Sequence, residues 1–280
     1  GGRIPGKGDV DVVFMTEPDS PTGPDSLSAL DRFSGTDFKR LDVDLTSEGP
    51  PTGLNQVLTA TSAEYIALIR DDSIVTRDWL TTLVGYLRAN PNIAMVGPRL
   101  PHGPEGQRMK GRYRSTRKEL QKFARGLHQR ETGRIEAVQF LNSACVLIRA
   151  EVLRDMGGFD GQFRTWAFLD DFARKCRQKG DTVNCAHDVF VHCLERDVHD
   201  AEDTERTAVT CLESGDRYRG SGQAEASREQ YALALEAKSD YMEAVLVLSS
   251  SLLEDGRGAE AADLFRKMEE LHPDSSRIKN

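Results

Sequence analysis

Apolar and polar positions follow two alternating patterns along the first 194 residues. Short apolar runs at 11–16, 38–43, 65–69, 93–96 and 140–148 predict strands. Between them, residues 26–33, 54–61, 79–89 and 169–179 have helical spacing, and in 79–89 the apolar positions are 79, 80, 83, 84 and 87. This alternation predicts a layered α/β sheet with functional sites at the ends of its strands.

The pattern changes after residue 207, where a period of 34 residues begins. It relates Tyr218 to Leu252, Gly222 to Gly256, Ser227 to Ala261, Tyr231 to Phe265 and Ser239 to Pro273. Small residues where helices touch, an aromatic residue in the second helix and a break at the repeat end are typical of tetratricopeptide repeats. The alternative is a pair of unrelated amphipathic helices. We predict one domain at 1–200 and an all-α tail of two repeats at 208–280.

Charge is distributed unevenly between these two parts. Of the net charge of −8, residues 1–194 hold 26 Lys/Arg against 25 Asp/Glu, and residues 195–280 hold 11 against 20. The acidic tail argues against nucleic acid as a partner. No apolar run reaches 18 residues, so no transmembrane segment is predicted. Five cysteines without metal-type spacing indicate the reduced thiols of a cytoplasmic protein.

Charged residues directly follow the apolar run at 65–69. Arg70, Asp71 and Asp72 stand where the predicted strand ends. A carboxylate at the end of a buried strand is costly to desolvate unless a partner compensates it. Two explanations are open: Arg70 pairs with Asp71 as a structural contact, or the carboxylates serve a ligand.

Four parts of the first domain resemble the family 2 glycosyltransferases, the inverting nucleotide-sugar enzymes of the GT-A fold. They are DVVFMTEPDSPTG (11–23), GLNQVLTATSAEYIALIRDDSIVTRDWL (53–80), NPNIAMVGPRL with NSACVLIRAEVLRDMGGFD (90–100 and 142–160), and FLDDFARKCRQKG with VFVHC (168–180 and 189–193). The resemblance covers about two thirds of the chain, and the order and spacing of the motifs carry it. It implies a GT-A-like mixed sheet that binds a nucleotide sugar. The family's first strand and helix are expected to be missing before Asp9.

The resemblance places the family's DxD motif at residues 70–72. Asp72 takes the metal-contacting position, Asp71 lies between, and Arg70 replaces the first aspartate. In many such enzymes carboxylates at a strand end hold Mn²⁺ or Mg²⁺, which neutralises the diphosphate. Either Asp72 binds the metal with few other protein ligands, or Arg70 itself supplies charge to the phosphates. His192 matches the family's late histidine, which reaches the metal or the diphosphate; the alternative is a core or capping residue.

Asp170 and Asp171 stand where the family has its catalytic acidic pair. Inversion needs a base that removes the proton of the acceptor hydroxyl while its oxygen attacks the anomeric carbon. The sequence leaves open which carboxylate serves, with a slight preference for Asp171. The alternative is an ordinary helix surface, because Asp170 with Arg174 and Asp171 with Lys175 are acid–base pairs spaced i,i+4.

Three further residues match nucleotide contacts of the family. Asn55 lies ten residues before Tyr65, as the family's asparagine does, and Glu17 and Asp19 occupy the acidic turn after the first strand. The resemblance implies that these side chains touch the nucleotide, and which of the two acids does so is open.

Residues 107–134 form a basic segment with ten Lys/Arg. It is interpreted as a solvated helix and loop, or alternatively as a lid over the diphosphate, a site for an anionic acceptor, or a contact with anionic membrane at the inner face.

The leading hypothesis is a glycosyltransferase of hexosyltransferase type that moves a sugar from a nucleotide-diphosphate sugar to a hydroxyl of a glycan, lipid or protein. The competing hypothesis is a non-catalytic scaffold that binds partners through its repeats. Two repeats are fewer than stable arrays usually have. We therefore expect an apolar end face, including Leu253, Leu264, Met268 and Leu271, to bind a second copy or another protein.

Overall fold

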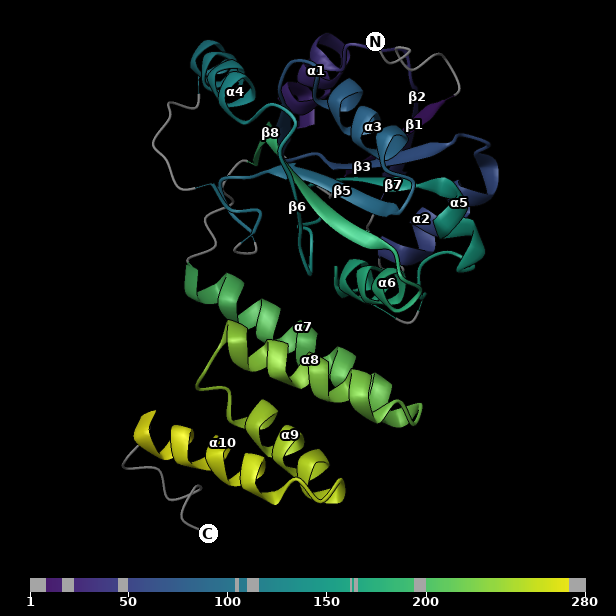
Figure 1. The fold of residues 1–280 in the computed structure, drawn as a ribbon. Coiled ribbons are helices and arrows are strands. Elements are labelled where there is room, and N and C mark those ends of the chain that lie inside the picture. Colours follow the sequence, from purple (N-terminus) through teal and green to yellow (C-terminus); the bar gives the residue numbers. More distant parts are fainter. Residues whose placement is uncertain are drawn as a thin grey trace. The chain divides into compact units, whose positions relative to one another are not determined.

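The computed structural model separates the chain into two compact units, Gly1–Leu194 and Glu195–Asn280, which are described here one at a time (Figure 1). The structure describes residues 9–16, 23–44, 50–103, 106–109, 116–161, 163, 166–193 and 200–271. Within this part of the chain, no helix has the length and apolar character needed to cross a bilayer.

The first unit is built on a mixed eight-stranded sheet with the order β2-β1-β3-β7-β5-β8-β4, and β6 pairs with β8 outside this path. The strands are β1 (Val10–Thr16), β2 (Lys39–Asp44), β3 (Tyr65–Arg70), β4 (Ser73–Val75), β5 (Ile93–Arg99), β6 (Ile135–Ala137), β7 (Cys145–Arg149) and β8 (Thr182–Cys193). β1 runs parallel to both β2 and β3, whereas β7 is antiparallel to β3 and β5. The predicted α/β sheet is confirmed, and its strand directions are mixed.

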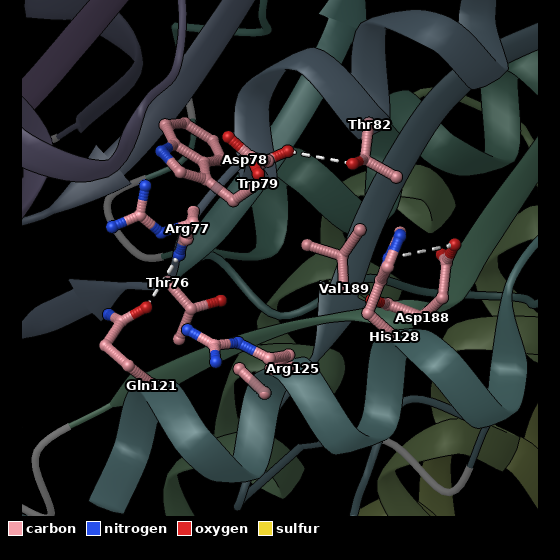
Figure 2. Close-up of a pocket in the computed structure, with 11 residues that line it drawn as sticks. Thr76, Arg77, Asp78, Trp79, Thr82, Gln121, Arg125, His128, Asp188 and Val189 are labelled. Carbon is pink, nitrogen blue, oxygen red and sulfur yellow. Dashed lines mark hydrogen bonds and ion pairs between the residues drawn. The ribbon is translucent and has the colours of Figure 1, made fainter. Parts of the chain in front are cut away.

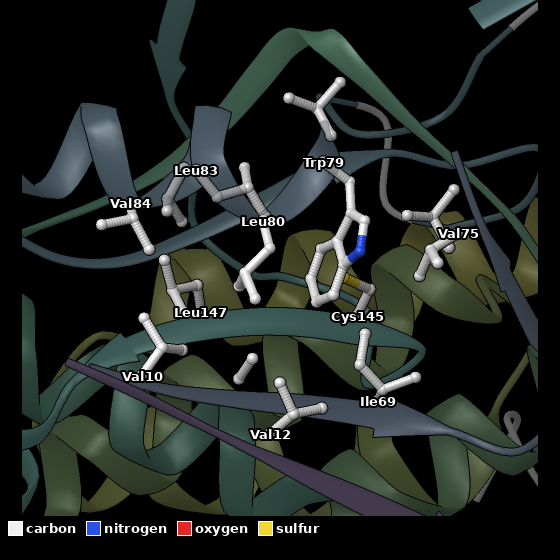
Figure 3. Packing of buried hydrophobic residues seen from close by; sticks show 14 of the residues in the cluster. Val10, Val12, Ile69, Val75, Trp79, Leu80, Leu83, Val84, Cys145 and Leu147 are labelled. Atoms are coloured by element: carbon white, nitrogen blue, oxygen red, sulfur yellow. The ribbon is translucent and has the colours of Figure 1, made fainter. Parts of the chain in front are cut away.

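Helices cover both faces of this sheet (Figure 1). They are α1 (Gly23–Phe33), α2 (Pro50–Ala60), α3 (Trp79–Ala89), α4 (Arg117–Glu131), α5 (Ala150–Asp155) and α6 (Ala167–Gln178). Alternate side chains of β3 enter opposite cores: Tyr65, Ala67 and Ile69 pack with α1 and α3, and Ile66 and Leu68 with α2, α5 and α6. Figure 3 shows Trp79, Leu80 and Leu83 of α3 packed over the first of these cores. Because both faces of β3 are buried, its sequence is a continuous apolar run.

One predicted strand begins later than expected. Residues 140–148 are apolar enough to predict a strand, but β7 begins at Cys145. The preceding residues form a turn in which Asn142 Oδ1 accepts a hydrogen bond from Ala144 N at 2.9 Å. Gln107 Oε1 accepts another from Asn142 N at 2.7 Å. These hydrogen bonds to side chains take the place of the backbone hydrogen bonds between strands. The predicted strand is therefore wrong for 140–144.

The described residues of the second unit, 200–271, form four helices, each packed on the next: α7 (Asp200–Gly220), α8 (Ala224–Ala237), α9 (Met242–Glu254) and α10 (Gly258–Leu271). Two turns 34 residues apart have the same geometry. Gly222 and Gly256 have φ values of 74° and 75°. Gln223 N donates to Tyr218 O at 2.9 Å, and Arg257 N donates to Leu252 O at 2.8 Å. The 34-residue period is therefore a structural repeat of the turn, while the assignment to tetratricopeptide repeats stays a prediction.

The expected apolar end face is only partly present. Met268 is buried, and Leu264 is half-buried against the cluster around Tyr231. Including Met268 in an exposed face was therefore wrong. The large hydrophobic side chains that are exposed in the described part of this unit are Leu246 and Leu253 on α9.

Candidate functional site

The candidate site lies where β1 and β3 end side by side. Met15 of β1 is in register with Arg70, and Met15 O accepts a hydrogen bond from Asp71 N at 3.0 Å. Ala144 O, just before β7, accepts one from Arg70 N at 3.1 Å. This arrangement fixes residues 70–72 at the carboxyl ends of two parallel strands, where α/β sheets place their ligands.

A buried ion pair dominates this edge of the sheet. Arg70 Nη2 is paired with Asp72 Oδ2, and their side chains are 17% and 4% exposed. Arg70 Nη1 also reaches Ser143 Oγ at 3.4 Å, and its guanidinium carbon lies 5.6 Å from the centre of the Trp166 ring. Removing one partner of such a pair would leave a buried charge without compensation, which typically costs about 3–5 kcal/mol. The Arg70–Asp72 contact is therefore a strong constraint on both side chains.

β4 and the end of β8 complete the site beside Asp72. The antiparallel register pairs Ser73 with Cys193 and Ile74 with His192, and His192 is buried. Ser73 Oγ donates to Ala144 O at 2.9 Å. Burial raises the pKa of the Cys193 thiol to about 12, and the Asp72 carboxylate adds to this rise while Arg70 opposes it. Cys193 is thus a neutral thiol next to the ion pair.

The two carboxylates at the start of α6 have different environments. Asp171 is buried and pairs with Arg174 at 3.1 Å and Lys175 at 2.7 Å. Asp170 is half-buried, and desolvation raises its pKa to about 7; the charge of Asp171 adds to this rise, and Arg177 opposes it. The i,i+4 pair expected for Asp171 and Lys175 is present, whereas Arg174 pairs with Asp171 at i,i+3.

Asn55 holds a loop. Its Nδ2 donates to Phe159 O at 2.7 Å, and its Oδ1 accepts from Phe159 N at 2.9 Å. Gly158 has a φ of 91°, and a Cβ there would lie 2.6 Å from Asn55 Oδ1. Both ends of the Asn55 amide therefore serve the turn after α5.

The remaining predicted residues do not extend the described site. Glu17 and Asp19 lie outside the described residues. In the ranges that the structure describes, no group of three or more His, Cys, Asp and Glu is arranged to hold a metal ion. Sequence reasoning missed Ser143, Trp166 and Cys193, which reach Arg70 and Asp72 from three distant segments. Only Trp166, an aromatic residue just before the acidic FLDD stretch, carried a signal in the sequence.

The basic segment forms a separate feature at α4. Leu120, Ala124 and Leu127 pack against Phe190, and the Lys and Arg side chains of this helix face solvent. Residues 110–115 of the segment lie outside the described residues. Exposed cations are compatible with each interpretation of this segment, so its role stays a prediction.

A small pocket lies between the start of α3, α4 and β8 (Figure 2). His128 Nδ1 approaches the buried carboxylate of Asp188 at 3.5 Å, and Arg77 N donates to Gln121 Oε1 at 2.9 Å. The pocket encloses about 80 Å³. Sites that enclose small molecules usually measure about 300–1,000 Å³. This pocket is therefore too small for a nucleotide sugar.

Two solved structures resemble this chain in fold. The mannosyltransferase PcManGT from Pyrobaculum calidifontis, in complex with GDP-Man and Mn²⁺, aligns over 95% of this chain and 88% of its own, with a TM-score of 0.53 and 14% identity. GalNAc-T7 with UDP, GalNAc and Mn²⁺ aligns over 67% of this chain and 44% of its own, with a TM-score of 0.50 and 11% identity. At these identities the likeness shows the fold.

Sequence comparisons point to the same class. The pre-mycofactocin glycosyltransferases of two Mycobacterium tuberculosis strains are 32% identical over 116 residues, which is 41% of this chain. The matched segment spans 23% of the length of these curated relatives. Residues 24–157 match the family model described as glycosyl transferase family 2. Together, the fold and these matches support a family 2 glycosyltransferase domain in the first unit of the chain.

Proposed function

We propose that the first unit transfers a hexose from a nucleoside-diphosphate sugar to an acceptor hydroxyl, with inversion at the anomeric carbon. The observation that carries this proposal is the buried Arg70–Asp72 pair at the carboxyl ends of β1 and β3. A diphosphate leaving group needs positive charge and hydrogen-bond donors as its bond to the sugar breaks. Among the solved neighbours, PcManGT binds GDP-Man, which belongs to this chemical class, and GalNAc-T7 holds UDP and GalNAc.

The reaction proposed is a single displacement. The acceptor oxygen forms a bond to the anomeric carbon, while the bond between that carbon and the diphosphate oxygen breaks. The electron pair leaves with the nucleoside diphosphate, and the proton of the acceptor hydroxyl passes to a carboxylate of α6.

Asp170 is the better base of the two carboxylates, although the sequence slightly favoured Asp171. A base works best when its pKa lies near the working pH, and burial brings the pKa of Asp170 to about 7. Asp171 is bound to Arg174 and Lys175. These two contacts hold the Asp171 oxygens in place. We therefore assign the base to Asp170 and a supporting role to Asp171.

The residues around Asp72 are a poor set of ligands for a divalent cation such as the Mn²⁺ present with both neighbours. Asp72 shares one carboxylate oxygen with Arg70, and the first position of the motif is itself a cation. Mn²⁺ and Mg²⁺ sites normally combine several oxygen ligands, and the described residues offer no such group. This donor set does not fit a metal held by Asp72 and His192, and the proposed displacement uses none.

Other parts of the assignment stay predictions. The name of the curated relatives makes a pre-mycofactocin acceptor one candidate, beside glycan, lipid and protein hydroxyls. Contact between α4 and anionic membrane is untested. A partner of the helical unit would contact the side of α9 that exposes Leu246 and Leu253. A nucleotide contact of Asn55 is not favoured, since its amide holds Phe159.

A donor panel tests the proposal. The whole chain is incubated with UDP- and GDP-hexoses, with Mn²⁺ and with EDTA, and release of the nucleoside diphosphate is measured. We expect turnover of at least one donor, and a loss of about 100-fold in Asp72→Asn, which removes the charge that fixes Arg70.

The matched control is Asp155→Asn, which changes an exposed aspartate at the end of α5 and should leave turnover unchanged. A correctly folded wild-type chain that releases no diphosphate from any donor would favour the scaffold hypothesis instead.

A further inference from the structure

Arg70 occupies the first position of the motif at residues 70–72, and its positively charged side chain lies inside the candidate site. The side chain of Arg70 is 17% exposed. Asp72 holds Nη2, Ser143 lies 3.4 Å from Nη1, and Trp166 covers the guanidinium at 5.6 Å. These contacts come from the turn between β3 and β4, the turn before β7 and the residue before α6, so three segments fix one guanidinium group.

Arg70 still has hydrogen-bonding capacity. A guanidinium has five N–H donors in a planar fork. The Nε atom of Arg70 is buried and has no hydrogen-bond partner among the described residues. Planar guanidinium groups bind phosphate oxygens through more than one N–H at a time. A buried, unpartnered N–H beside the end of a strand is therefore suited to an oxyanion.

A divalent cation would compete with Arg70 for the same carboxylate. Asp72 Oδ2 is bound to Arg70 Nη2, and a metal on Asp72 would lie within a few ångströms of the guanidinium charge. Like charges repel strongly at that separation in a partly buried site. Metal and arginine are thus alternative partners of Asp72.

We propose that Arg70, and not a divalent metal ion, binds the diphosphate of the donor, so that this transferase works without metal. The proposal rests on the function proposed above and specifies how the leaving group is neutralised. In it, Arg70 touches the diphosphate, whereas Asp72 and Trp166 are positioning residues that hold the guanidinium.

Calorimetric titration of the whole chain tests the proposal, with UDP, GDP and inorganic pyrophosphate as probes, first in EDTA and then with Mn²⁺. We expect wild type to bind a nucleoside diphosphate equally well in both conditions. Arg70→Ala should lose at least tenfold in affinity in both, and Arg70→Lys should keep part of the binding. Arg70→Asp, which places a carboxylate at the first position of the motif, should bind only with Mn²⁺.

Arg266→Ala is the matched control, because Arg266 is exposed and pairs with Asp263 on the surface of α10. Thermal unfolding of each variant shows whether it is folded, and Arg70→Lys keeps the test valid if Arg70→Ala is not. Binding or donor turnover by wild type that requires Mn²⁺ would overturn the proposal and leave the transferase assignment intact. The same holds if folded Arg70→Ala binds like wild type. A wild type that binds no diphosphate with or without Mn²⁺ would contradict both.

Discussion

The two units bury polar residues of different kinds. Among the described residues, the first unit buries charged side chains at several places, including Asp71, Asp72, Asp171, Arg174 and Asp188. The second unit buries neutral ones: Ser214, Ser227, Gln230, Ser249 and Ser251. Burying a charge is far more costly than burying a hydroxyl or an amide. Among the described residues, buried charge is therefore found in the unit for which we propose a charged ligand.

The buried hydroxyls of the helical unit serve helix packing. Ser227 Oγ donates to Gly215 O at 2.8 Å, and Tyr231 Oη donates to Asp216 Oδ1 at 2.7 Å. Both contacts join α8 to α7.

One buried carboxylate of the first unit does not lie at the candidate site. Asp11, near the start of β1, is buried against the hydroxyl of Thr61, so one buried carboxylate there is structural.

The largest expected effect concerns Asp170. Asp170→Asn removes the proposed base and should lower turnover by about 10²–10⁴-fold, while calorimetric binding of the nucleoside diphosphate stays unchanged. In wild type, kcat should rise with pH through about 7, because the carboxylate must be ionised and its pKa is raised to about 7. A folded Asp170→Asn variant with normal turnover would show that this half-buried carboxylate has no catalytic role.

The same shift has a consequence for stability. The pKa of Asp170 rises from 3.8 to about 7 on folding, so between these values the folded state keeps a proton that the unfolded state releases. The contribution of Asp170 to the free energy of unfolding therefore falls as the pH rises from about 4 to about 7. Asp170→Asn should be less sensitive to pH over this range in urea unfolding.

The second effect is on stability and concerns Asp171. Asp171→Asn removes the carboxylate that pairs with the buried guanidinium of Arg174 at 3.1 Å. We expect the free energy of unfolding to fall by about 3 kcal/mol in urea denaturation, against less than about 0.5 kcal/mol for the exposed Asp155→Asn. Equal stability of the two variants would mean that Arg174 does not depend on this carboxylate.

The third effect tests packing in the helical unit. A Cβ at Gly215 would lie 2.3 Å from Tyr231 Cε1, whereas one at Gly220 of the same helix meets nothing within 4 Å. Gly215→Ala should destabilise this unit by about 1–3 kcal/mol, measured by thermal unfolding, and Gly220→Ala should not. If both variants unfold like wild type, the close contact between α7 and α8 is not required.

The smallest effect concerns a charge pair of the helical unit that is not buried on both sides. Arg228 and Asp255 are 2.9 Å apart, with side chains 14% and 46% exposed. A double-mutant cycle with alanine at both positions should give a coupling of about 0.5 kcal/mol. A coupling as large as that of a buried pair would remove the contrast between the two units.

The sequence predicted the parts of the fold in which one face or both faces are clearly apolar. The strands around Val12, Leu68 and Val96 are continuous apolar runs because helices cover both sides of the sheet. The strands β4 and β6 have three residues each and are too short to show a pattern of apolar and polar positions. The first half of β8 contains Asn184 and His187, which break the apolar pattern.

The site could be predicted only where its residues are neighbours in the sequence. Arg70 and Asp72 stand two residues apart at a strand end, so their importance was readable. Ser143 reaches them through the antiparallel pairing of β7 with β3, and Cys193 through that of β8 with β4. Such contacts depend on strand order, which the hydrophobic pattern does not specify.

The most direct test of the account is a crystal structure of the chain with a nucleoside diphosphate and Mn²⁺, with anomalous diffraction data that locate manganese. We predict diphosphate oxygens within hydrogen-bond distance of the Arg70 guanidinium, Asp72 still paired with Arg70, and no anomalous peak on the Asp72 carboxylate. A manganese ion bound to Asp72 and to the diphosphate, with Arg70 turned away, would contradict it.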